Sequence, residues 1–148
     1  MTAVHLAGPE DAERLRPMIA ACHDEMQIAD DTTTRDAALM PLLSGSPHGA
    51  IYLIGPARAP IGYIVISFGW SLAFGGLVGV VEEVWIRAGV RGRGIASEVL
   101  NSLPKALAVA GLRALHLEVH RDDTRAQDIY RRQKFTARPD YVLMTQKF

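Results

Sequence analysis

The sequence has few of the features that mark secreted, membrane-bound or nucleic-acid-binding proteins. Its 148 residues include one cysteine, Cys22, so an intramolecular disulfide is excluded and an oxidising compartment is not indicated. Sixteen basic residues balance sixteen acidic ones, which leaves no overall charge to attract nucleic acid or an anionic membrane. No apolar run approaches the roughly 20 residues that span a bilayer, and the N-terminus lacks the basic and apolar regions of a signal peptide. We therefore expect a cytoplasmic protein that binds neither nucleic acid nor membrane.

The composition and the hydrophobic periodicity favour one mixed α/β domain over residues 1–148. A hydrophobic content of 49% is enough for one sizeable core in a chain of this length. The periodicity changes from helical to extended after residue 46 and then alternates, so that a helix joins two strands as a crossover between parallel neighbours. Helices are predicted at 9–26, at 94–110, at 124–133 and from an N-cap at Thr33 or Thr34 to about 44–46; strands are predicted at 3–6, 50–54, 61–68, 80–86, 114–119, 135–137 and 141–147.

A loop rich in glycine and arginine follows the strand predicted at 80–86 and leads into the helix at 94–110. Gly92 and Gly94 permit backbone conformations that other residues resist and allow a ligand to approach the amides closely. The free N–H groups that open the helix, together with the helix dipole, form an anion site. Arg91 and Arg93 add positive charge at its rim. The loop therefore predicts a phosphate-binding site.

This stretch matches neither of two other phosphate-binding motifs in full. The Walker A pattern is absent. A dinucleotide-binding loop requires a third glycine where Ser97 stands, although Glu118 lies where an acid that binds ribose would be expected. A nucleotide-binding oxidoreductase therefore stays as a minor alternative.

Two motifs in the second half of the chain resemble the GNAT superfamily of acetyl-CoA dependent N-acetyltransferases. The first is Arg91-x-x-Gly94-x-Ala96, preceded by the strand residues Val84-Trp85-Ile86. The second is the strand at 115–119 followed by a helix with the pattern Asp123-x-x-Ala126-x-x-Ile129-Tyr130 and then Phe135. The resemblance covers about residues 61–148. It implies a central mixed β-sheet of about six to seven strands flanked by about four helices, with acetyl-CoA as cosubstrate.

The resemblance also implies which residues bind the cosubstrate. By this resemblance the pyrophosphate lies against residues 91–96, and the backbone of strand 80–86 binds the acetyl carbonyl and pantetheine. Two residues of the last helix, one at its start and one a tyrosine, also contact the cosubstrate. The implied residues are Val84, Ile86, Arg91, Gly92, Arg93, Gly94, Ile95, Ala96, Asp123 and Tyr130. The chain departs from the family pattern at Asp123, where asparagine is usual, and at Lys134, where glycine is usual.

Acetyl transfer to an amine requires a proton acceptor, because an alkylamine with a pKa near 10.4 is neutral in only about one molecule in a few thousand at pH 7. Strict alternation along strand 80–86 puts Glu82 on the face of Val84 and Ile86, and Glu83 on the face of Trp85. Glu82 is therefore our candidate base, with Glu83 as the alternative. The Val84 N–H is the candidate donor to the developing oxyanion, and the resemblance makes Tyr130 the general acid.

Several questions stay open at the level of sequence. The acceptor is expected to be a primary amine of a small molecule or peptide, attacked directly in a ternary complex. A non-catalytic acyl-CoA sensor is the alternative from another class. No metal is expected: His116, Glu118 and His120 alternate on one strand face, but a half-polar strand explains that pattern. The apolar, glycine-rich segment 70–79 could line the acceptor pocket or form a homodimer contact, or it is an ordinary hairpin loop.

Overall fold

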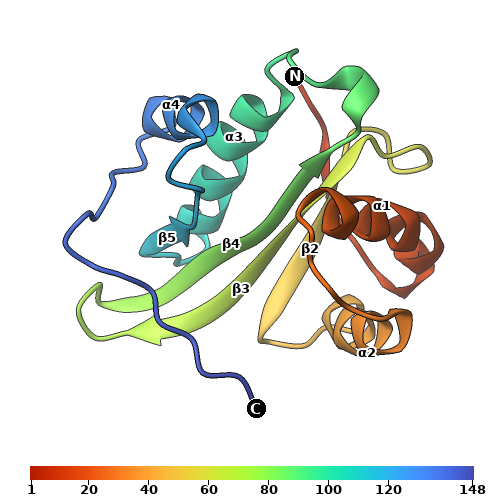
Figure 1. Ribbon diagram of the computed structural model, residues 1–148, viewed down its shortest axis with the longest axis horizontal. Coiled ribbons are helices and arrows are strands. Elements are labelled where there is room, and N and C mark those ends of the chain that lie inside the picture. The colour runs from red at the N-terminus through yellow and green to blue at the C-terminus, as the bar shows by residue number, and fades with distance from the viewer. The chain divides into compact units, whose positions relative to one another are not determined.

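A five-stranded mixed sheet organises residues 1–118. The computed structural model describes residues 1–148, and the strands follow the spatial order β1-β2-β3-β4-β5 (Figure 1). β1 (Val4–Leu6), β2 (Gly49–Ile54), β3 (Gly62–Ser71) and β4 (Gly76–Ile86) pair antiparallel, and β5 (Ala114–Leu117) lies parallel to β4. The parallel pair is joined by a crossover helix, as the sequence predicts.

Helices cover the sheet because each buries one apolar stripe. α1 (Ala12–Glu25) and α2 (Thr32–Leu43) bury their apolar positions against the face that carries Leu53, Tyr63 and Trp85. The crossover helix α3 (Ile95–Val109) buries three residues of its own, Val99, Leu100 and Leu103. Two short 3-10 helices, η1 (Pro9–Asp11) and η2 (Ala88–Val90), precede α1 and α3.

Residues 119–148 form a second compact unit. Its one helix, α4 (Thr124–Arg132), is capped at its start by the Asp123 carboxylate, which accepts a hydrogen bond from the Ala126 amide at 3.0 Å. After the helix the Phe135 N–H donates to the Tyr130 carbonyl at 3.0 Å. That one domain spans residues 1–148 stays a prediction.

The mixed α/β class and the four helices are confirmed, and two predictions about elements are wrong. The expected strands at 135–137 and 141–147 do not form, so the sheet has five strands rather than six or seven. Alternating apolar residues give a segment the propensity for a strand, but a strand also needs a neighbour to hydrogen-bond, and none pairs with these segments. The N-cap of α2 is Asp31, whose carboxylate accepts from the Thr34 amide at 2.7 Å, rather than Thr33 or Thr34.

The turn after α4 shows why glycine is usual at the position of Lys134. Lys134 has φ of +72°, in the left-handed region where glycine is favoured. A lysine there carries a steric cost between its Cβ and the following carbonyl of about 1 kcal/mol.

We expect Lys134→Gly to stabilise this turn by about 1 kcal/mol, because glycine removes that steric cost at the end of α4. Native-state hydrogen exchange of the Phe135 amide should slow by about fivefold. Lys134→Ala, which keeps a Cβ, is the matched control and should give no comparable gain. Equal exchange rates in the glycine and alanine variants would contradict the explanation.

Candidate functional site

A β-bulge interrupts β4 at Glu82. Val65 of β3 pairs with Glu83 and the next residue, Ile66, pairs with Val81, so Glu82 is an extra residue with no partner on β3. A bulge of this kind changes which residues of the strand point to each side. The strict alternation assumed from the sequence therefore fails at this position.

Beyond the bulge, one side of β4 has no neighbouring strand. The Arg87 N–H donates to the Ile61 carbonyl at 2.7 Å, so this residue's peptide group faces β3. Because peptide groups alternate along a strand, those of Val84 and Ile86 face the other way. β5 lies on that side, but its pairing with β4 ends at Val81. Two backbone N–H groups, those of Val84 and Ile86, are therefore directed at an open edge of the sheet.

The glycine-rich loop that follows β4 has the backbone geometry that the sequence predicts. Gly92 and Gly94 both lie in the left-handed region, with φ of +79° and +77°. Gly94 is the N-cap of α3, and no side chain accepts a hydrogen bond from the first turn of the helix. The leading amides of α3 are thus available to an anion, and the helix dipole adds to their attraction. Ile95 and Ala96 lie in this first turn.

The two arginines of the loop are not equivalent. The Arg91 Nε donates to the Ile86 carbonyl at 2.7 Å, and its guanidinium forms an ion pair with Glu25 at 2.8 Å and lies 5.9 Å from the centre of the Trp85 ring. The Arg91 side chain therefore ties the loop to the end of α1, and that Arg91 adds positive charge at the rim stays a prediction. Arg93 is exposed and forms no ion pair.

The two adjacent glutamates on β4 lie on one face of the sheet rather than on two. Glu83 stands opposite Val65 and bonds with Tyr63, both on the face covered by α1 and α2. The exposed Glu82 accepts from the Ser67 hydroxyl at 2.6 Å, and Ser67 lies two residues from Val65 on that same face. The expectation that Glu82 shares the face of Val84 and Ile86 is wrong, and the bulge is the reason.

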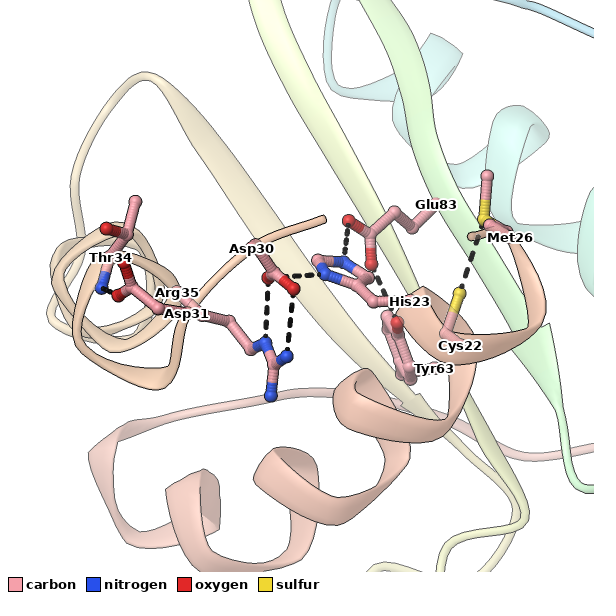
Figure 2. A network of polar contacts seen from close by, with 9 residues as sticks. All are labelled: Cys22, His23, Met26, Asp30, Asp31, Thr34, Arg35, Tyr63 and Glu83. Atoms are coloured by element: carbon pink, nitrogen blue, oxygen red, sulfur yellow. Dashed lines mark hydrogen bonds and ion pairs between the residues drawn. The ribbon is translucent and has the colours of Figure 1, made fainter. Parts of the chain in front are cut away.

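A partly buried polar network surrounds Glu83. One Glu83 oxygen accepts from the Tyr63 hydroxyl at 2.7 Å, and the other lies 2.8 Å from His23 Nε2. The Nδ1 of His23 lies 2.7 Å from Asp30, which also binds Arg35 at 2.9 Å and 3.0 Å (Figure 2). We call these five residues, Arg35, Asp30, His23, Glu83 and Tyr63, the His23 network.

The His23 network shifts the pKa values of its members in consistent directions. Burial opposes a charge on His23, but its hydrogen bonds to Glu83 and Asp30 outweigh burial and raise the pKa of the imidazole. The Arg35 guanidinium, followed by His23, holds the pKa of Asp30 well below its usual range. Burial and the contacts with Cys22 and Glu83 raise the pKa of Tyr63. The two carboxylates beside His23 thus favour its cationic form.

Sequence reasoning missed His23 and Tyr63. A signal for His23 was present, because it lies four residues after Ile19 and eight after Leu15 on the apolar face of α1. Asp30 belongs to an acidic stretch that could attract a cationic substrate, although such a stretch is more typical of a solvated helix end.

The second unit contains two of the residues that the resemblance implied. Asp123 lies at the start of α4, with its carboxylate engaged as the helix cap. The Tyr130 ring packs edge-on against Phe135 at a centroid distance of 6.1 Å. Burial, together with the nearby Asp123 charge, raises the pKa of Tyr130 and keeps the phenol protonated.

The structure also gives the positions of the remaining candidates from the sequence. His116 stacks edge-on with Phe74 at 5.2 Å, and no set of three or more His, Cys, Asp or Glu side chains is placed to hold a metal ion. Residues 72–75 form the turn between β3 and β4. A shallow hollow of about 470 Å³ adjoins this turn and is lined by Trp70 and Arg113, among others. It lies at the start of β4 and the end of α3, whereas Val84 lies toward the end of β4 and Gly94 at the start of α3. No helix has both the length and the apolar character needed to cross a membrane.

Comparison with known proteins agrees with this geometry. The model of the acetyltransferase (GNAT) family matches residues 15–135. An integron cassette protein, HFX_CASS3, from the mobile metagenome of Cole Harbour Salt Marsh has 27% identity and a TM-score of 0.82, with 97% of this chain and 89% of that chain covered. A putative acetyltransferase from Arthrobacter sp. FB24 has 25% identity and a TM-score of 0.77, with 99% and 93% covered.

A third solved structure shares the fold at lower identity. AAC(6')-Iy, in complex with the bisubstrate analogue CoA-S-monomethyl-acetylneamine, has 15% identity and a TM-score of 0.79, with 100% of this chain and 99% of that chain covered. No match was found among curated proteins by sequence.

The chain belongs to the GNAT acetyltransferase family. The dinucleotide-binding alternative is accordingly wrong, and the sheet gives the physical reason. A doubly wound nucleotide-binding domain needs a mostly parallel sheet, whereas here only β4 and β5 run parallel.

The raised pKa of His23 predicts how the stability of the fold depends on pH. A group whose pKa is higher in the folded than in the unfolded state stabilises the fold fully below its unfolded value, about 6.5, and loses that contribution as the pH rises through the folded value. The difference in unfolding free energy between wild type and His23→Leu should therefore shrink from pH 6 to pH 9 in urea titrations. A difference that stays constant over this range would contradict the assignment of a cationic His23.

Proposed function

We propose that this acetyltransferase moves an acetyl group from acetyl-CoA to a primary amine of a small molecule or peptide, by direct attack in a ternary complex. The observation that carries the proposal is the set of free backbone N–H groups in one region: those of Val84 and Ile86 at the open edge of β4, and those in the first turn of α3. The first pair suits a carbonyl and an extended amide chain, and the second suits a diphosphate. The complex of AAC(6')-Iy with a CoA-linked analogue supports the choice of ligand.

The cosubstrate would be held mainly by the main chain. Gly92, Gly94, Ile95 and Ala96 would bind the pyrophosphate with backbone amides, and Arg93 would add charge at the rim. Arg91 would both fix the loop, through its bonds to the Ile86 carbonyl and Glu25, and contribute positive charge to the pyrophosphate site. Asp123 would contribute from the start of α4. Acetyl-CoA, when bound, supplies an activated acetyl thioester.

Three groups of the chain would carry the chemistry. Glu82 would accept a proton from the ammonium form of the acceptor, directly or through water, since its carboxylate is exposed and holds one hydrogen bond, from Ser67. The Val84 N–H would donate to the oxyanion that develops as the amine attacks. Tyr130, which lies in the second unit, would donate a proton to the departing sulfur, a role that rests on the family resemblance.

A turnover screen with Gly94→Ala tests the proposal. Wild type should release coenzyme A from acetyl-CoA only when an amine is present. An alanine at φ of +77° is strained although it meets open space, so the loop should relax and direct its amides away, raising the Kd for coenzyme A by about tenfold. Isothermal calorimetry measures this change.

Gly89→Ala is the matched control for the glycine loop. Gly89 lies in the same connection between β4 and α3, has open space at its Cβ position and lacks a positive φ. Coenzyme A should bind this variant as it binds wild type. Equal affinities of the Gly89 and Gly94 variants for coenzyme A would contradict the proposed pyrophosphate site. Turnover without an amine would contradict the proposed reaction.

Tyr130→Phe should lower kcat by about 100-fold while changing the KM for acetyl-CoA much less, because a proton donor acts in the transition state and not in binding. Steady-state kinetics at saturating amine measures both constants. The Phe ring keeps the contact with Phe135, so packing is preserved. An unchanged kcat would remove Tyr130 from the mechanism.

A further inference from the structure

His23 joins the segment that follows α1 to strand β4. It lies in the last turn of α1, with 12% of its side chain exposed, and its ring nitrogens contact Asp30 and Glu83 at 2.7 Å and 2.8 Å. Asp30 belongs to the segment between α1 and α2, and Glu83 follows the bulge of β4. One ring thus connects the segment after α1 to the strand that carries Glu82 (Figure 2).

Both ring contacts require the imidazolium. A neutral imidazole has one N–H and one lone pair, so it can donate to only one of two ionised carboxylates and repels the other. Arg35 binds both oxygens of Asp30, which keeps that carboxylate ionised and aimed at the ring. The network therefore alternates in charge from Arg35 to Glu83 and ends at the neutral Tyr63 hydroxyl.

The contacts of Glu83 distinguish it from its neighbour Glu82. Both Glu83 oxygens hold a donor, one from Tyr63 and one from His23, whereas Glu82 is exposed and holds the Ser67 hydroxyl. The Glu83 side chain is only 22% exposed and each of its oxygens faces a donor of the network, so an amine or a water has less access to it than to the exposed Glu82. The bulge places these two carboxylates on one face, so their partners decide which of them is free to react.

We propose that His23 is a positioning residue of the acyl-transfer site: by binding Glu83 it withdraws that carboxylate from the reaction and leaves Glu82 as the group that accepts the proton of the amine. Asp30 and Arg35 act one step further out, because they keep the His23 ring oriented toward Glu83. This inference rests on the proposed function.

The other charged or titratable groups around the ring leave this assignment unchanged. On α1 they are Cys22, whose pKa is raised by burial, the exposed Asp24, and Glu25, which Arg91 holds by an ion pair. The connecting segment contributes Asp30, α2 contributes Arg35, β3 contributes Tyr63 and β4 contributes Glu83. Only Asp30 and Glu83 bond to the ring itself.

A double-mutant cycle tests the proposal. In the wild type, Glu82→Gln should lower kcat by about 100-fold or more, the loss expected when a general base is removed. In the His23→Leu background, Glu83 loses the donor on one oxygen and can take the proton instead, so Glu82→Gln should cost about tenfold or less. If His23→Leu does not fold, His23→Gln is the second variant, since its amide cannot reproduce the charged bridge.

Asp36→Asn is the matched control background. The Arg16–Asp36 ion pair also joins α1 to α2, at 2.7 Å, but neither residue bonds to the sheet. Glu82→Gln should keep its full cost of about 100-fold in this background. An equal cost of Glu82→Gln in the wild-type and His23→Leu backgrounds would overturn the proposal, as would a reduced cost in the Asp36→Asn background.

The ring itself provides a readout that needs no turnover. The NMR titration midpoint of His23 should fall in both Glu83→Gln and Asp30→Asn, because each substitution removes one acceptor of the charged ring. A midpoint that moves in neither variant would overturn the network. Absence of turnover in the wild type with every amine, by contrast, would contradict the proposed function.

Discussion

The bulge at Glu82 is the feature on which the rest of the site depends. The Leu77 carbonyl accepts from Arg113, on the side of β4 that faces β5. Counting by twos from Leu77, residues 83 and 85 would face that side if the strand were regular. The extra residue shifts the count to Val84 and Ile86 and also brings Glu82 onto the face of Glu83. A single unpaired residue thus sets which amides meet the open edge and where both carboxylates lie.

The open edge and the start of α3 are linked through the same strand. β5 pairs with β4 only up to Val81, so the last part of β4 continues past its neighbour. The loop after it must then reverse within a few residues, and Gly92 and Gly94 allow this by adopting positive φ. Arg91 fixes the loop from the inside through the Ile86 carbonyl and Glu25. The anion site is therefore a consequence of backbone geometry, with side chains in a supporting role.

The end of α1 contributes to both sides of this arrangement. Glu25 binds Arg91 and the Trp85 indole, and His23, half a turn earlier, binds Glu83. Both contacts are made near the C-terminal end of β4: that of Glu25 beside the anion site, and that of His23 beside the two glutamates. Every buried side-chain polar atom has a hydrogen-bond partner, as a partly buried polar network requires, because a buried polar group without a partner is costly.

The sequence by itself determined the mixed α/β class, the positions of the four helices, the crossover between parallel strands and the glycine loop at the start of α3. These features depend on local periodicity and on the steric freedom of glycine, and both are properties of residues close together in the sequence. Tertiary structure alone decided the bulge, the pairing of Arg91 with Glu25, the His23 network and the absence of the last two strands. The first three depend on partners far away in the chain, such as Glu83 for His23, and the last depends on the lack of a pairing strand. A one-residue shift in register between two strands leaves no mark on hydrophobic alternation, yet it changes the side to which each later residue points.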